Sequence, residues 1–248
     1  MRRISDAVKH LLIINVLLFI ATQAYGDQMY QWLSLWFPKN ENFGFWQLVS
    51  HMFMHGNFMH ILFNMYALWA FGSPLEQIWG KNRFFFFYFS AGIGAALIHS
   101  GVNYYYFNEG FQALLNAGIS EADILSLLNS GQYNTGWYDV ASKNVIDNFL
   151  SAYSTPAVGA SGAIYGILVA FGMLFPNAEL FLIFIPVPIK AKYFIPALIA
   201  LDLFSGVTGY SIFGAGIAHF AHVGGALFGF IMMWYWKRNQ FNNNRWDL

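Results

Sequence analysis

Ser161 and His222 are two side chains whose types could together perform covalent chemistry. Ser161 lies in a Gly-Ala-Ser-Gly segment (159–162) at the start of an apolar run, and His222 lies in an Ala-His-Val-Gly-Gly segment (221–225) inside another. A serine hydroxyl becomes a useful nucleophile only when a base lies within hydrogen-bond reach. A serine among small residues often does no more than let membrane helices pack closely. The catalytic interpretation therefore requires a fold that brings Ser161 and His222 together.

Composition assigns the class of protein. Of the 248 residues, 57% are hydrophobic, 20% are aromatic and only 10% are charged, and the mean hydropathy is +0.45. These values are too apolar for a soluble domain and predict an integral membrane protein. The net charge of zero argues against nucleic acid as a partner. The absence of cysteine excludes disulfides, thiol catalysis and metal sites with cysteine ligands.

Apolar runs long enough to cross a bilayer as helices predict an all-α bundle of six transmembrane helices. They lie near residues 8–25, 57–78, 83–105, 157–175, 191–208 and 216–236. The first run follows basic residues, as a signal peptide does, but we interpret it as a retained span because no convincing cleavage site follows. With both termini in the cytoplasm, ten basic residues lie inside and only Lys39 and Lys143 lie outside, which fits the positive-inside rule.

Two connections on the predicted outer side are long. Residues 26–56 contain aromatic side chains of a kind typical of the membrane–water interface, among them Trp32, Trp36, Phe37, Phe43, Phe45 and Trp46. The segment of about 106–155 is acidic and rich in Asn, Ser and Gly, and it forms an external loop between the third and fourth helices. Within it, Ser120 is a plausible N-cap with Asp123 at capping-box distance. We interpret this loop as a tolerated insertion in a single domain covering residues 1–248, and a role in substrate choice is the alternative.

Depth in the membrane provides a first test of the catalytic interpretation. Counting about 1.5 Å per helical residue from the outer ends of their spans places Ser161 roughly 8 Å and His222 roughly 9 Å deep. Glycines near both residues, Gly162 and Gly225 among them, form small-residue faces that allow the two helices to approach closely. The sequence therefore predicts contact between Ser161 and His222.

A third pair of polar residues lies at the same depth in the second span. His60 and Asn64 are spaced i, i+4 and share one helix face. Polar groups buried in a membrane are costly and usually functional. Both side chains can donate hydrogen bonds, which suits an oxyanion hole that stabilises a tetrahedral intermediate.

Together these motifs resemble those of the rhomboid intramembrane serine proteases. The motifs are Ser161 in Gly-Ala-Ser-Gly, His222 in Ala-His-Val-Gly-Gly, His60-x-x-x-Asn64 and the Gly72-x-x-x-Glu76-x-x-x-Gly80 pattern at the end of the second span. The resemblance implies that Ser161 is the nucleophile and that His222 is the general base of a dyad without a carboxylate. It also implies an oxyanion hole formed by His60, Asn64 and the Ser161 backbone N–H.

The resemblance implies further roles. Tyr165 matches the position of an aromatic ring that supports the catalytic histidine, the glycines at 159, 162 and 225 support the site, and Asp202 matches a position that we treat as structural. The family usually has arginine after the tryptophan of the first external loop, whereas Gln47 follows Trp46 here. The substrates would be transmembrane proteins in the bilayer, no metal or cofactor is implied, and we expect a prokaryotic plasma (inner) membrane with the site open to the extracytoplasmic side.

Other interpretations of these residues stay open. His51 and His55, with His60 as a third ligand, could bind a metal, although hydrogen bonding to the loop backbone is the simpler role. His219, three residues before His222, could be the base instead. Glu76, near Arg83, is expected to brace the cytoplasmic helix end. At the level of the whole chain, the alternatives are a non-catalytic rhomboid-like protein that binds membrane clients and, less well supported, a transporter.

Overall fold

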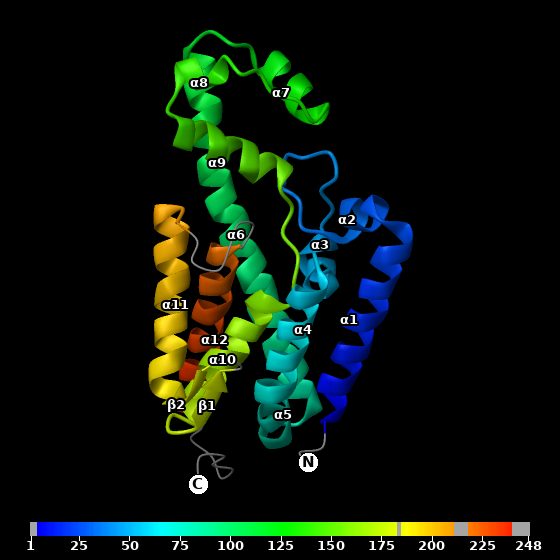
Figure 1. Ribbon diagram of the computed structural model, residues 1–248, viewed down its shortest axis with the longest axis vertical. Coiled ribbons are helices and arrows are strands. Elements are labelled where there is room, and N and C mark those ends of the chain that lie inside the picture. The colour runs from blue at the N-terminus through cyan, green and yellow to red at the C-terminus, as the bar shows by residue number, and fades with distance from the viewer. Residues whose placement is uncertain (1–3, 183–184, 211–217, 240–248) are drawn as a thin grey trace.

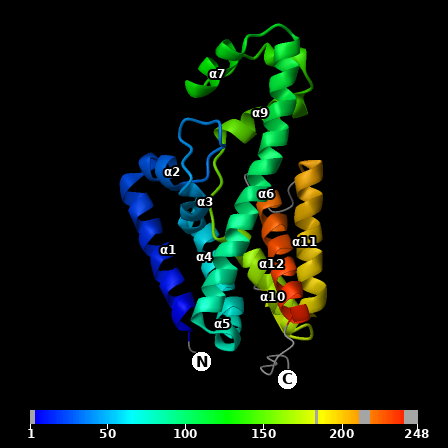
Figure 2. The same ribbon diagram turned by 180° about the vertical axis from the view of Figure 1, so that it is seen from behind.

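The computed structural model describes residues 4–182, 185–210 and 218–239, and most of them are helical. The long segments lie along one axis (Figure 1, Figure 2) and are α1 (Asp6–Tyr25), α4 (Phe58–Ala67) continued by the π-helical η2 (Leu68–Gly72) and α5 (Ser73–Trp79), α6 (Lys81–Asn116), α10 (Ser161–Leu174), α11 (Ala191–Thr208) and α12 (His219–Asn239). The start of α1 and the end of α12 lie at one end of the molecule, and α7 to α9 lie at the other (Figure 1).

The helices coincide with the six predicted apolar runs, with two differences in length. α6 continues to Asn116, well past the predicted end near 105, and α10 begins at Ser161 rather than near residue 157. By length and composition, α1, α6 and α11 can cross a membrane, whereas α10 is an apolar helix of 14 residues. The crossing of all six segments and the cytoplasmic position of both termini stay predictions.

One element departs from the all-α expectation. Strands β1 (Glu179–Leu182) and β2 (Ile185–Lys190) form an antiparallel hairpin between α10 and α11, with Glu179 opposite Lys190. Alternation of Ile, Val and Ile with two prolines in β2 favours an extended strand over a helix, and a two-stranded ribbon has edges that tolerate proline. The hairpin lies at the end of the molecule opposite α7 to α9 (Figure 1).

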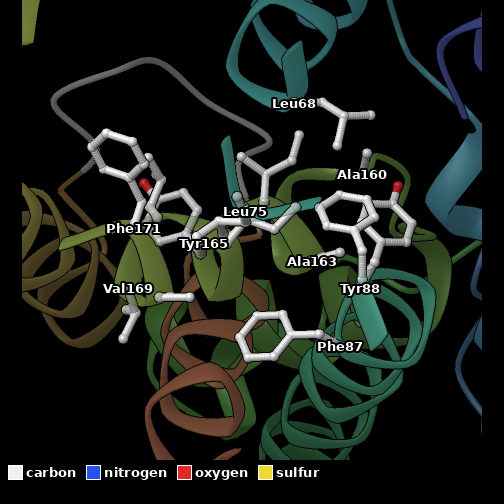
Figure 3. Packing of buried hydrophobic residues seen from close by; sticks show 14 of the residues in the cluster. Leu68, Leu75, Phe87, Tyr88, Ala160, Ala163, Tyr165, Val169 and Phe171 are labelled. Atoms are coloured by element: carbon white, nitrogen blue, oxygen red, sulfur yellow. The ribbon is translucent and has the colours of Figure 1, made fainter. Parts of the chain in front are cut away.

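Helix α10 is the central helix of the bundle. All ten residues from Gly162 to Phe171 are buried, as expected for a helix that is apolar on every side. Figure 3 shows Ala163 and Tyr165 of α10 packed among Leu75 of α5 and Phe87 of α6. The first residue of this helix, Ser161, is therefore held by a rigid surrounding core.

Helices α10 and α12 approach to backbone contact, as the predicted glycine faces require. A Cβ atom added to Gly225 would lie 1.8 Å from the carbonyl oxygen of Gly162, and one added to Gly229 would lie 2.6 Å from Cα of Gly166. No side chain larger than hydrogen fits at these two positions without movement of a helix. Glycine is therefore required at the contact that sets the distance between Ser161 and His222.

Gln47 organises the segment between α1 and α4, which contains α2 (Asp27–Leu33), α3 (Gln47–Ser50) and η1 (His51–Phe53). Its fully buried side-chain amide donates to the carbonyl oxygen of Asn42 at 2.7 Å and lies 3.2 and 3.3 Å from those of Gln31 and Trp32. Its own oxygen accepts from the backbone N–H of Trp36 at 3.2 Å. A neutral amide thus ties the loop together at the position where the family usually has arginine.

The predicted loop of about 106–155 is a helical layer, which we call the cap: the outer part of α6 with α7 (Glu121–Asn129), α8 (Trp137–Val140) and α9 (Lys143–Ser154). α6 has 36 residues and is about 54 Å long, so it exceeds a hydrocarbon core of about 30 Å. The cap has its own apolar core, which includes Trp137, Ile146 and Phe149. As predicted, Ser120 caps α7 by accepting from the N–H of Asp123 at 3.1 Å.

Glu76 of α5 braces the opposite end of the bundle, as expected, and its partners lie on α1. Its carboxylate is buried and accepts from the backbone N–H of Ala7 at 2.7 Å and of Val8 at 3.0 Å. The first amides of a helix have no partner within the helix, and a negative charge there also interacts well with the helix dipole. Glu76 therefore fixes the start of α1 against the helical segment that holds His60 and Asn64.

Candidate active site

Ser161 is presented by a short extended segment that leads into α10. Ala157 exchanges two backbone hydrogen bonds with Leu35, both of 2.9 Å, and the N–H of Gly159 donates to the carbonyl oxygen of His51 at 2.9 Å. Gly159 has φ +122°, a conformation that favours glycine. The helical rise assumed for residues 156–160 was therefore wrong, because residues 156–159 are not helical, Ala160 is the N-cap and Ser161 is itself the first residue of the helix.

His222 lies in the first turn of α12 and reaches Ser161. Its Nε2 atom is 2.8 Å from Ser161 Oγ, so the structure brings together the two groups that the sequence predicts to meet. The Tyr165 ring stacks on the imidazole, with centroids 4.3 Å apart and planes within 11°. This stacking fits the predicted support of the histidine by an aromatic ring, and such ring pairs contribute about 0.5–1.5 kcal/mol.

A carboxylate also contacts His222, although the resemblance implied a dyad without one. The Nδ1 atom of His222 lies 3.0 Å from Oδ1 of Asp202 on α11, and Nδ1 of His219 lies 2.6 Å from the same oxygen. The Tyr165 hydroxyl donates to the other oxygen, Oδ2. Asp202 interrupts an apolar run, and an ionisable residue in such a run is itself a signal of function. His219 thus contacts Asp202, while the histidine at Ser161 is His222, as predicted.

Of the side chains predicted to form an oxyanion hole, the structure places His60 beside the start of α10. A Cβ atom on Gly159 would be 2.7 Å from Nε2 of His60 and 3.5 Å from Ser161 Oγ, so the imidazole of His60 and the serine hydroxyl face the same glycine. Asn64 is buried one helical turn after His60, and its amide donates one hydrogen bond to the His60 carbonyl oxygen at 2.9 Å. The Ser161 N–H belongs to the first turn of α10, where helix amides lack partners within the helix.

The alternative metal site at His51, His55 and His60 is not formed among the described residues. Across residues 4–182, 185–210 and 218–239, the one set of three metal-type side chains whose ligand atoms converge is Asp202, His219 and His222. His51 is instead hydrogen-bonded through Nδ1 to the carbonyl oxygen of Gln47 at 2.7 Å. The simpler role, hydrogen bonding to the loop backbone, is the one that the structure shows for His51.

An apolar groove of about 440 Å³ lies close to this cluster, between α6 and the start of α12. Its lining includes Leu97, Tyr105 and Phe220 and none of the four predicted site residues. Ser161 and His60 are themselves partly exposed. The opening of the site to the extracytoplasmic side stays a prediction.

Comparisons with known proteins agree with these motifs. A family model described as the Rhomboid domain matches residues 42–130 and 131–239. Over 74% of its length, the chain is 30% identical to the human presenilin-associated rhomboid-like protein, mitochondrial, and 29% identical to rhomboid protease AarA of Providencia stuartii. Over 76% of its length, it is 27% identical to rhomboid protein 1, mitochondrial, of Saccharomyces cerevisiae. The matched regions cover 35%, 53% and 41% of those three proteins, respectively. The chain is an integral membrane protein that belongs to the rhomboid family.

Proposed function

We propose that this protein is an intramembrane serine endopeptidase that hydrolyses peptide bonds in or near transmembrane segments of other membrane proteins. The observation that carries the proposal is the 2.8 Å contact between Ser161 Oγ and His222 Nε2. Both groups lie at the ends of helices whose backbones touch, so their geometry is set by the bundle. Membership of a family that includes a protease at 29% identity adds support.

The reaction follows from this geometry. His222 Nε2 accepts the proton of Ser161 as the serine oxygen attacks the substrate carbonyl carbon. The negative charge on the carbonyl oxygen is stabilised by the Ser161 N–H and the side chains of His60 and Asn64, which act as fixed donors. The tetrahedral intermediate collapses when His222 donates the proton to the leaving amine. Water, activated by the same imidazole, then hydrolyses the acyl-enzyme.

Substrate access follows from the membrane setting. A peptide bond within a transmembrane helix has its backbone groups satisfied internally, so the substrate must unwind locally before the serine can attack. We propose that all six helical segments cross the bilayer, with both termini in the cytoplasm and the cap outside, so that Ser161 opens to the extracytoplasmic side. Two of the relatives reported above carry mitochondrial names and one is bacterial, and we propose the bacterial setting, a plasma (inner) membrane.

The proposal is tested with purified protein and a reporter whose transmembrane helix contains helix-destabilising residues. Wild-type protein cleaves the reporter near the extracytoplasmic end of the helix, whereas Ser161→Ala and His222→Ala do not, although both variants fold and express normally. Gly101→Ala is a matched control, because its added Cβ meets no atom within 4 Å. Full cleavage by either Ser161→Ala or His222→Ala would overturn the proposal, and an inactive, folded wild type would favour a non-catalytic role in binding membrane clients.

A further inference from the structure

We propose that Asp202 is a positioning residue that holds His222 in the tautomer needed to accept the proton of Ser161. This inference rests on the proposed hydrolase function and extends it from a serine–histidine pair to a chain of three groups. The chain runs from Ser161 Oγ to His222 Nε2 over 2.8 Å, and from His222 Nδ1 to Asp202 Oδ1 over 3.0 Å.

Hydrogen-bond chemistry links this geometry to a proton position. An ionised carboxylate can only accept, so the contact with Asp202 requires the proton of neutral His222 to lie on Nδ1. Nε2, on the opposite side of the ring, then has its lone pair directed at Ser161 and can act as a base. When the proton of Ser161 moves to Nε2, the imidazolium retains both ring protons and the carboxylate stabilises its charge without taking a proton.

The surroundings of Asp202 provide the hydrogen bonds that an ionised carboxylate requires. The side chain is 1% exposed, and a buried charge is tolerated only when it is paired and hydrogen-bonded. His219 Nδ1 lies 2.6 Å from Oδ1, and the Tyr165 hydroxyl donates to Oδ2, so two groups besides His222 fix the carboxylate. Tyr165 also stacks on His222 and thereby ties the carboxylate and the imidazole into one unit.

The same three side chains, two histidines and one aspartate, could be taken for a zinc site. Ligand atoms around tetrahedral zinc are about 3.3 Å apart, since each bond is about 2.0–2.1 Å long. Oδ1 of Asp202 lies 2.6 Å and 3.0 Å from the two Nδ1 atoms, which is the range of direct hydrogen bonds. The geometry therefore favours hydrogen bonds over a metal between these atoms.

The test compares Asp202→Asn with Ser205→Ala. Ser205 is a matched control, because it lies about one turn further along α11, is buried, and has no hydrogen-bond partner among the described residues. An asparagine amide can donate to His222 Nδ1 and so favours the tautomer with the proton on Nε2, which faces Ser161. In soluble serine proteases the equivalent change lowers kcat by about 10⁴-fold. We expect a fall in kcat of at least about 100-fold with little change in KM or in thermal stability, and no change in Ser205→Ala.

A second measurement does not depend on catalysis. Nitrogen-15 NMR of wild-type protein with labelled histidine separates protonated from unprotonated ring nitrogens, and the His222 signals are those that disappear in His222→Gln. We expect Nδ1 protonated and Nε2 unprotonated in neutral His222, and the reverse in Asp202→Asn. The metal chelator EDTA should change neither the spectrum nor the rate.

The outcomes separate the two claims. A wild-type protein that neither cleaves the reporter nor reacts with a fluorophosphonate probe at Ser161 would overturn the proposed function. An active wild type with the His222 proton on Nε2, or an Asp202→Asn variant with wild-type kcat, overturns the inference about Asp202 and leaves the hydrolase intact. Loss of thermal stability in Asp202→Asn, with an Nε2-protonated wild type, would mean that Asp202 is purely structural.

Discussion

Replacing Gly225 with alanine should move His222 on α12 away from Ser161 on α10. The added Cβ would lie 1.8 Å from the Gly162 carbonyl oxygen, whereas carbon and oxygen in ordinary contact lie about 3.2–3.5 Å apart. Helices α10 and α12 must therefore separate locally by roughly 1.5 Å. Gly225 is three residues after His222, and residues at this spacing lie on one helix face. The displacement therefore acts directly on the 2.8 Å contact between His222 and Ser161.

A shift of this size has two measurable effects. Overpacking of a well-packed core costs about 1–3 kcal/mol of stability. Misplacement of a catalytic group by about 1 Å can cost about 100-fold in rate. We therefore expect Gly225→Ala to lower kcat/KM for the transmembrane reporter by at least about 100-fold and to reduce the free energy of unfolding by about 1–3 kcal/mol. Thermal unfolding in detergent measures the stability, and reporter cleavage in liposomes measures the rate.

Two control variants distinguish the effect of a clash close to the active site from the effect of replacing any glycine. Gly229→Ala would place a Cβ 2.6 Å from Cα of Gly166, about one turn further from the site, so its loss of activity should be smaller. Gly101→Ala, in the open on α6, should retain full activity. Wild-type activity and stability in Gly225→Ala would refute the inference that backbone contact between α10 and α12 sets the geometry of the site.

Three other perturbations have distinct expected results. His60→Ala or Asn64→Ala should lower turnover by about 100- to 1,000-fold while leaving Ser161 reactive toward a phosphonate probe, and unchanged turnover in both would make the pair structural. Glu76→Gln keeps one acceptor and loses the charge at the start of α1, so the free energy of unfolding should fall by about 1–3 kcal/mol. An unchanged melting temperature would contradict the bracing role. In the cap, the hydrogen bond from Lys143 holds the pKa of Asp147 below its usual range. The stability that this pair contributes is thus present above the unfolded pKa of about 4 and is lost as the pH falls through the folded value, so amides at the start of α9 should exchange faster in acid. Lys143→Gln should weaken that dependence without removing it, because the Tyr138 hydroxyl also donates to Asp147.

Much of the bundle could be predicted because apolar length and glycine spacing are local properties of the sequence. The predicted run 191–208 coincides with α11, and the glycine faces on α10 and α12 are in contact as expected. The pairing of His222 rather than His219 with Ser161 also followed from the Gly-Gly that comes after His222. These features depend on the spacing of residues within a single helix, which decides which of them lie on the same face.

The features that were missed depend on contacts between distant segments. The extended approach to Ser161 is held by Leu35, more than a hundred residues earlier, and no local pattern predicts that pairing. The N-cap at Ser120 is predicted by a local pattern, but the packed core of the cap is not, because its apolar residues are scattered and include Phe37 from the first external segment. The interpretation of this segment as a tolerated insertion stays a prediction. The contact of Asp202 with His222 could not be predicted, because it joins α11 and α12 and the sequence does not specify how these helices are aligned.

The most direct test of the central claim, that His222 activates Ser161 as a nucleophile, is mapping of a fluorophosphonate adduct by mass spectrometry. Folded wild-type protein should have the adduct on Ser161, since only an activated serine reacts with such a probe. His222→Ala should remain unlabelled at the same probe concentration and time. A folded wild-type protein with no adduct on Ser161, or equal labelling of Ser161 in wild type and His222→Ala, would contradict the claim.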